Sequence, residues 1–234
     1  AEIDSSANIY KDNVLIGSQD ATLYCLKASD GSPVWKFQID DQIRCTPTVV
    51  ENRCFLAGCD GKLHIVDLDK GQAVDDVPIE SPTGTTPAVR GARVYFGTHA
   101  GQFFCIDWRE AKAIWTWQDE NNAAEFRASA ALGEKLAIVG DRRRRVFALD
   151  LESGEMKWEF PTKRNVDSSP VIVGQRAFFG TGDGVVYAVE VDSGKELWSY
   201  EAGGGFIGSP AVADGKLFIA SEDGVLYCFG RKND

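Results

Sequence analysis

Histidine is scarce in this sequence, and the common motifs of catalysis and metal binding are missing. There are only two histidines, His64 and His99, and no Cys-x-x-Cys pair, so the ligand spacing of a zinc site is absent. A G-x-S-x-G motif and a phosphate-binding P-loop are absent as well. Repeated Asp-Gly pairs are present, but turn chemistry explains them without calcium. The sequence therefore predicts no catalytic residues, no metal site and no bound cofactor.

Positive charge and long apolar runs are also scarce. With 25 basic and 35 acidic residues the formal net charge is −10, which argues against binding to nucleic acid or to an anionic membrane surface. No apolar run approaches the roughly 18 residues of a membrane-spanning helix, so direct membrane insertion is not expected. The first residues, Ala1-Glu2-Ile3-Asp4, do not resemble a signal peptide. A mature chain, a cytoplasmic protein and a segment cut from a longer protein remain as alternatives.

The main feature that is present is a sequence pattern that occurs six times: an apolar strand, a tight turn and a second apolar strand. In several copies the turn is Asp-Gly, a strong hairpin signal because Gly accepts a positive φ. The six copies are Leu15–Leu26, Phe55–Val66, Tyr95–Ile106, Ala137–Leu149, Phe178–Val189 and Phe218–Phe229. A Ser/Thr-Pro marker recurs in steps of 40, 43, 40 and 40 residues from Pro47 to Pro210, with Ala130 in place of one proline. Such a period indicates a repeat architecture.

Each unit contains four short strand signals, which predicts an all-β fold: a β-propeller of six four-stranded blades. We expect a single domain over residues 1–234. Its repeat units are 5–44, 45–84, 85–127, 128–167, 168–207 and 208–230. The last unit stops after its third strand and is expected to lack its outer strand. The unpaired edge that this leaves is a possible site of self-association.

Six cysteines are present, and their positions indicate packing rather than chemistry. In five of the six units one repeat position holds a small residue, which predicts a small buried slot there: Cys25, Cys105, Ala148, Ala188 and Cys228. In the second unit Cys45 and Cys54 are expected on one face and Cys59 on the other. A Cys45–Cys54 disulfide is left open.

Tryptophans mark four of the units at one position, four residues after a turn. They are Trp35, Trp115, Trp158 and Trp198, and in the second unit Asp75 takes this position. The phrase Ala-Leu-Asp…Ser-Gly…Trp at residues 148–158 resembles the tryptophan-docking motif of the PQQ-like (pyrroloquinoline-quinone-type) propeller repeat, and the resemblance covers essentially the whole chain. It implies that these four indoles are structural and pack onto the neighbouring blade.

The resemblance leaves the function open between several kinds of bacterial protein. Quinoprotein dehydrogenases of this family have eight blades, a vicinal Cys-Cys disulfide and a calcium site, which this sequence lacks. It looks closer to non-catalytic binding propellers such as the lipoprotein that scaffolds outer-membrane β-barrel assembly. We therefore expect a protein-binding scaffold and not an enzyme. A PQQ-dependent redox enzyme or its remnant, and a sensor domain cut from a membrane or kinase protein, are the alternatives. Family resemblance alone suggests a periplasmic or extracytoplasmic location.

Two surfaces are candidate binding sites. The first is a basic patch in the fourth unit, where the turn between the second and third strands contains four consecutive arginines. Guanidinium groups suit the recognition of carboxylate or phosphate, which suggests an acidic protein partner. Its residues are Arg142, Arg143, Arg144, Arg145, Lys163, Arg164 and Arg127. The second is the expected mouth of the central channel, with Asp4, Arg44, Arg127 and Asp167. The competing interpretation is ordinary solvated charge in the first case and mutual ion pairing in the second.

Overall fold

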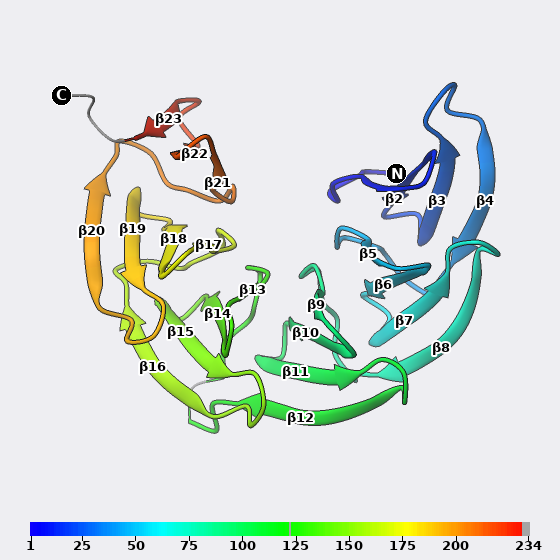
Figure 1. The fold of residues 1–234 in the computed structure, drawn as a ribbon, viewed down its shortest axis with the longest axis horizontal. Coiled ribbons are helices and arrows are strands. Elements are labelled where there is room, and N and C mark those ends of the chain that lie inside the picture. The colour runs from blue at the N-terminus through cyan, green and yellow to red at the C-terminus, as the bar shows by residue number, and fades with distance from the viewer. Residues whose placement is uncertain (122, 231–234) are drawn as a thin grey trace. The chain divides into compact units, whose positions relative to one another are not determined.

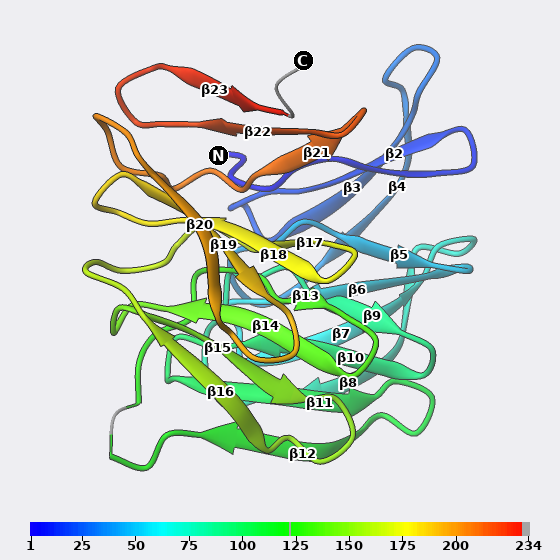
Figure 2. The ribbon, with the colours of Figure 1, turned by 60° about the vertical axis from the view of Figure 1, so that its left-hand side comes forward.

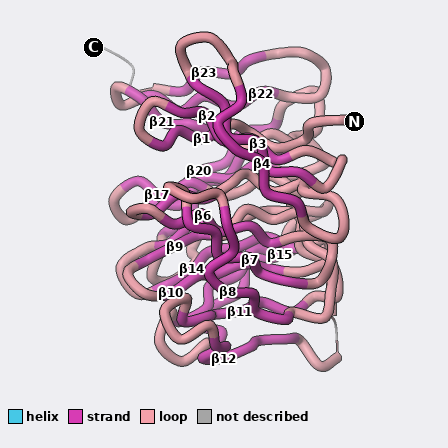
Figure 3. The backbone as a smooth tube through the Cα atoms, turned by 90° about the vertical axis from the view of Figure 1, so that its right-hand side faces the viewer, coloured by secondary structure: helices cyan, strands magenta, loops and turns pink. Residues whose placement is uncertain are grey.

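The computed structural model describes residues 1–121 and 123–230, and within these residues all regular secondary structure is β-strand (Figure 3). No helix in this part of the chain is long and apolar enough to span a membrane. The 23 strands form six antiparallel sheets, five with four strands and one with three. These sheets are the six blades of a β-propeller, with the last blade truncated, as the sequence predicted.

The chain divides into two compact units, residues 1–118 and 119–234, each with three blades that follow one another in chain order (Figure 1). The expectation of one domain over residues 1–234 stays a prediction. In the first unit, blade 1 contains β1(Asn8–Tyr10), β2(Asn13–Gly17), β3(Thr22–Lys27) and β4(Pro33–Gln38); blade 2 contains β5(Thr48–Val50), β6(Arg53–Ala57), β7(Lys62–Asp67) and β8(Gln72–Pro78); blade 3 contains β9(Ala88–Arg90), β10(Arg93–Gly97), β11(Gln102–Asp107) and β12(Lys112–Gln118).

The second unit repeats this arrangement and ends one strand short (Figure 2). Blade 4 contains β13(Ala131–Leu132), β14(Leu136–Asp141), β15(Arg145–Asp150) and β16(Met156–Pro161); blade 5 contains β17(Val171–Val173), β18(Arg176–Gly180), β19(Val185–Glu190) and β20(Glu196–Glu201); blade 6 contains β21(Ala211–Ala213), β22(Lys216–Ala220) and β23(Leu226–Phe229). Strands pair in sequence order within every blade, so each blade is a meander.

Tight turns and bulges set the geometry of each blade. The turns between second and third strands place Gly61, Gly101, Gly184 and Gly224 at positive φ, a conformation that costs least without a Cβ. In blades 1 to 5 the pairing of third and fourth strands shifts by one residue, as between Ala188 and Val189. Such a bulge increases the local twist and bends the outer strand.

The core lies between successive blades of a unit. Leu23 and Cys25 of blade 1 are fully buried in one cluster with Leu56 and Val66 of blade 2. In the second unit a corresponding cluster joins Ile138, Val146 and Ala148 of blade 4 to Phe179 and Val189 of blade 5. The face of one blade therefore covers the face of the next, as expected for a repeat whose units cannot bury their apolar faces alone.

The Ser or Thr residues of the Ser/Thr-Pro marker form hydrogen bonds between successive blades. At each described step, a backbone N–H of one blade donates to the hydroxyl of the equivalent residue, forty positions further along the chain. The bonds are Ser6 to Thr46 (3.1 Å), Thr46 to Thr86 (3.1 Å), Ser129 to Ser169 (2.9 Å) and Ser169 to Ser209 (3.1 Å). The hydroxyl thus satisfies a backbone donor at the inner strands.

The prediction of a small buried slot is confirmed at four positions and wrong at one. Cys25, Cys105, Ala148 and Ala188 are buried, whereas Cys228 is exposed. The reason is that, within unit 2, no described strand pairs with the outer edge of β23. All six cysteines are free in the structure, including the Cys45 and Cys54 pair.

Candidate functional site

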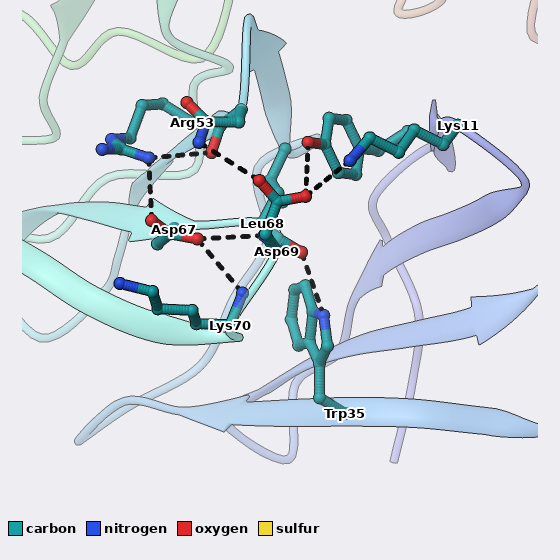
Figure 4. Close-up of polar contacts among 9 residues, drawn as sticks. Lys11, Trp35, Arg53, Asp67, Leu68, Asp69 and Lys70 are labelled. Carbon is teal, nitrogen blue, oxygen red and sulfur yellow. Dashed lines mark hydrogen bonds and ion pairs between the residues drawn. The ribbon is translucent and has the colours of Figure 1, made fainter.

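Trp35 shows how a docking tryptophan joins two blades (Figure 4). Its indole N–H, on β4 of blade 1, donates to the carbonyl oxygen of Leu68 in blade 2 at 3.1 Å. The ring lies against Gly71, where an added Cβ would approach a ring carbon to 2.5 Å, so only glycine allows this contact. Beside it Lys11 and Tyr10 bond the Asp69 carboxylate at 2.6 and 2.8 Å. These hydrogen bonds lower the pKa of Asp69 to about 2, with Lys11 making the largest contribution.

Of the other three docking tryptophans, one repeats this arrangement and two lie in different surroundings. Trp158 repeats the arrangement in unit 2: its N–H donates to the Val191 carbonyl at 2.8 Å and its ring lies against Gly194. Trp115 packs on Tyr95 and Phe103 of its own blade, with ring centroids 6.0 and 6.2 Å away. Trp198 remains 38% exposed and touches Tyr200 and Phe229.

The arginine-rich turn of blade 4 projects between two loops of the same unit. The Arg142 N–H donates to the Glu125 carbonyl in the loop before blade 4, at 3.2 Å. On the other side the Thr162 N–H donates to the Arg144 carbonyl at 2.7 Å, and the Val166 N–H to the Asp141 carbonyl at 3.2 Å. The structure therefore brings Arg127, Lys163 and Arg164, which lie on these loops, around residues 142–144.

Arg145 differs from its three neighbours because it points into the protein. It is 8% exposed and contacts Asp141 at 2.7 Å, Asp119 at 2.8 Å and Glu159 at 3.1 Å. Burial raises the pKa of Asp141, while the surrounding carboxylates keep the guanidinium of Arg145 charged. Arg145 is therefore an internal ion-pair residue and is not part of the exposed surface that the sequence predicted.

The exposed members define a surface that we call the basic surface: Arg127, Arg142, Arg143, Arg144, Lys163 and Arg164. Two carboxylates interrupt it. Glu125 accepts from Arg127 at 2.9 Å and lies 3.6 Å from Arg142, and Asp167 lies 3.7 Å from Arg142. Six cationic groups thus gather in one cluster on a protein of net charge −10.

The predicted channel-mouth residues are engaged by side chains of their own loop or, for Asp4, of the turn between β2 and β3. Asp4 accepts from Gln19 at 2.6 Å, and Arg44 donates to the Gln42 side chain at 2.7 and 3.0 Å. Asp167 accepts from Asn165 at 2.7 Å, and Arg127 bonds Glu125 as above. These contacts are local, and a ligand role for the set stays a prediction.

No sequence pattern singles out His64. It lies on β7 of blade 2, 3% exposed, with Nδ1 2.7 Å from Asp76 and Nε2 2.9 Å from Asp60. Phe37 packs edge-on against the ring with a centroid distance of 5.9 Å. Asp76 stands opposite His64 in the strand pairing, a relation that only the register of β7 and β8 reveals. The group is a buried polar anchor between two carboxylates.

The residues present do not fit a quinone and calcium centre. Among residues 1–121 and 123–230, no group of three or more His, Cys, Asp or Glu side chains is placed to hold a metal ion. The sequence also has no adjacent cysteine pair.

Blades repeated at a forty-residue period and joined by docked tryptophans define this protein as a tryptophan-docked β-propeller. The family model described as outer membrane protein assembly factor BamB matches residues 5–74, 55–160, 114–205 and 158–233, in overlapping stretches that cover nearly the whole chain. The chain belongs to this family of PQQ-like propellers.

Individual relatives are distant. BamB of Shewanella oneidensis is 22% identical over 173 residues, 67% of this chain and 42% of that protein. The β-alanine-activating enzyme of Danio rerio is 28% identical over 101 residues, which is 40% of this chain and 9% of that enzyme. The chain thus matches less than half the length of either. The crystal structure of BamB from Moraxella catarrhalis superimposes with a TM-score of 0.81 at 18% identity, over 99% of this chain and 73% of that one.

Proposed function

We propose that this protein is a non-catalytic scaffold propeller that binds an acidic segment of a protein partner through the basic surface of blade 4. Its relatives include outer membrane protein assembly factors, which supports a scaffold role and an extracytoplasmic location. The observation that carries the proposal is a cluster of exposed guanidinium and ammonium groups on a protein of net charge −10. Guanidinium groups bind carboxylates in bidentate geometry, and local positive charge steers acidic partners toward this face.

The backbone at Arg144 gives independent support. Its φ is 69°, a left-handed conformation, at the position where the equivalent turns of blades 2, 3, 5 and 6 have glycine. A side chain in this conformation costs about 1 kcal/mol relative to glycine. Blade 1 has Ala21 at the equivalent position with a φ of 67°, so the turn accepts other residues, and in blade 4 this position places a guanidinium at the tip of the turn at a cost in stability.

The test uses a fluorescent glutamate-rich peptide as the probe and two triple variants with the same charge change. Arg143→Glu, Lys163→Glu and Arg164→Glu together alter the basic surface. Lys112→Glu, Lys135→Glu and Lys195→Glu together alter exposed lysines elsewhere and serve as the control. We expect at least about tenfold weaker binding for the first variant only, and a steep loss of wild-type binding with salt. Equal loss in both variants, or no wild-type binding, would contradict the proposal.

Arg144→Gly separates recognition from folding. Removing the side chain should stabilise the protein by about 1 kcal/mol, because glycine tolerates the positive φ, and should still weaken peptide binding. Urea unfolding followed by circular dichroism measures the first effect, and fluorescence anisotropy the second. A variant that is both more stable and an equally good binder would remove Arg144 from the recognition surface.

A further inference from the structure

Glu125 lies between two arginines of the basic surface and contacts both. Its Oε1 accepts from Nε of Arg127 at 2.9 Å, and its Oε2 lies 3.6 Å from Nη1 of Arg142. Each carboxylate oxygen therefore faces a different guanidinium, an arrangement in which one carboxylate bridges two arginines. Arg127 and Arg142 thus form a clamp of the size of a single carboxylate, and Glu125 fills this clamp from within the protein.

The backbone holds the clamp in place without the Glu125 side chain. The Arg142 N–H donates to the Glu125 carbonyl at 3.2 Å, and this bond ties the loop before blade 4 to the arginine-rich turn. The same loop is anchored at its start, where Asp119 contacts the buried Arg145 at 2.8 Å. Because neither contact uses the Glu125 carboxylate, that carboxylate can leave the clamp while both contacts remain.

Asp167 is the second carboxylate near Arg142, and it differs from Glu125 in burial. Its side chain is 11% exposed, against 28% for Glu125, and its Oδ2 accepts from Asn165 at 2.7 Å. Its Oδ1 is buried 3.7 Å from Nε of Arg142 and has no hydrogen-bond partner among the described residues. Asp167 is therefore a fixed counter-charge for Arg142, whereas Glu125 is the carboxylate that a ligand can displace.

The contacts of Glu125 are of the kind that an incoming carboxylate replaces. Its distance to Arg142 is longer than a hydrogen bond. Arg127 is 52% exposed, so its pair with Glu125 is a surface ion pair, which contributes little to stability and is screened by salt. A ligand carboxylate that takes the place of Glu125 therefore loses little, whereas one that leaves Glu125 in the clamp meets the repulsion of a like charge.

We propose that Arg127 and Arg142 are the specificity-determining clamp of the basic surface, and that Glu125 is an internal ligand which a carboxylate of the acidic partner segment displaces. This inference rests on the proposed function, since it assumes that the basic surface binds such a segment. The clamp selects a segment that offers one carboxylate to both arginines. A neutral segment leaves Glu125 in place and is thereby rejected.

Glu125→Gln tests the clamp, with the fluorescent glutamate-rich peptide as the probe. The substitution removes the competing charge and keeps the backbone bond to Arg142, so we expect about three- to tenfold tighter binding in fluorescence anisotropy. Glu120→Gln is the matched control, because it removes the same charge from the same loop and Glu120 contacts no arginine among the described residues. It should change the affinity by less than about twofold. Circular dichroism verifies that both variants fold.

A double-mutant cycle separates displacement of Glu125 from simple removal of its charge. Arg127→Gln should weaken peptide binding at least about threefold more in the Glu125→Gln background than in the otherwise unchanged protein, where the lost Glu125 pair offsets part of the contact with the peptide. Equal effects of Arg127→Gln in both backgrounds would overturn the clamp. Equal effects of Glu125→Gln and Glu120→Gln, or weaker binding by Glu125→Gln, would overturn it as well.

The outcomes distinguish the clamp from the function on which it rests. Charge reversal of Arg143, Lys163 and Arg164 alters the basic surface without touching the clamp. If that reversal weakens peptide binding but Glu125→Gln has no effect beyond its control, the surface binds the acidic segment without the clamp, and only this inference fails. If neither the unchanged protein nor Glu125→Gln binds the peptide, both fail.

Discussion

Replacing Trp158 by alanine should destabilise the protein much more than replacing Trp198, although both tryptophans hold the same repeat position. Trp158 is half-buried, donates a 2.8 Å hydrogen bond and packs on Gly194, whereas Trp198 is 38% exposed and lacks such a bond in the described residues. Truncation of a packed aromatic residue costs about 3–5 kcal/mol. We expect about 3 kcal/mol for Trp158→Ala and about 1 kcal/mol for Trp198→Ala, because partial exposure reduces both the lost contact area and the lost hydrogen bonding.

Urea unfolding followed by far-ultraviolet circular dichroism measures both values, since fluorescence would lose the altered reporter. The difference of about 2 kcal/mol corresponds to about 4–8 °C in melting temperature for a chain of this size. Trp158→Phe is the control, because it keeps most of the ring packing and loses only the N–H donor. It should destabilise the protein by about 1 kcal/mol relative to the wild type, clearly less than Trp158→Ala does. Equal destabilisation by Trp158→Ala and Trp198→Ala would refute the claim that docking, and not the aromatic residue itself, supplies the stability.

Three further predictions concern the same contacts and the absent cofactor. Gly194→Ala should cost about 2–3 kcal/mol because the new Cβ meets the Trp158 ring, whereas Gly174→Ala, with φ 58° and no neighbour within 4 Å, should cost about 1 kcal/mol; equal costs in urea unfolding would remove the docking explanation. The pKa of Asp69 falls from 3.8 to about 2 on folding, so its contribution is present above pH 3.8 and is lost as the pH falls to about 2. Asp69→Asn should therefore weaken the dependence of the melting temperature on pH between pH 3.8 and about 2. An unchanged dependence would show that the Lys11 contact does not contribute to stability. Finally, pyrroloquinoline quinone with calcium should leave the melting temperature unchanged, and a rise of several degrees would favour the quinoprotein alternative.

Much of the fold was predictable because the signals that define it are local. Alternating apolar residues, Asp-Gly turns and a forty-residue period lie within single hairpins, so the four-stranded blades and the truncated sixth blade follow from the sequence. The exposed arginines of blade 4 were also predictable, since a tight turn between two strands projects its side chains outward. Their ligand remains a prediction.

The errors arose where a residue's role depends on partners far away in the sequence. Arg145 looks like one more arginine of a turn, yet it is buried and reaches Asp119, which lies 26 residues earlier. His64 occupies an ordinary strand position, and only the register with β8 places Asp76 against it. Cys228 shares a repeat position with buried residues and is exposed because, among the described residues, no fourth strand lies beside β23.

The sequence by itself determined the blade as a unit, the order of its strands and the family, because turn preferences and hydrophobic period act over a few residues. Only the tertiary structure decided which charged side chains are available and which tryptophans are docked. Burial and hydrogen bonding depend on what neighbouring blades supply, so Trp158 and Trp198, placed identically by the repeat, become a packed joint and a partly exposed side chain.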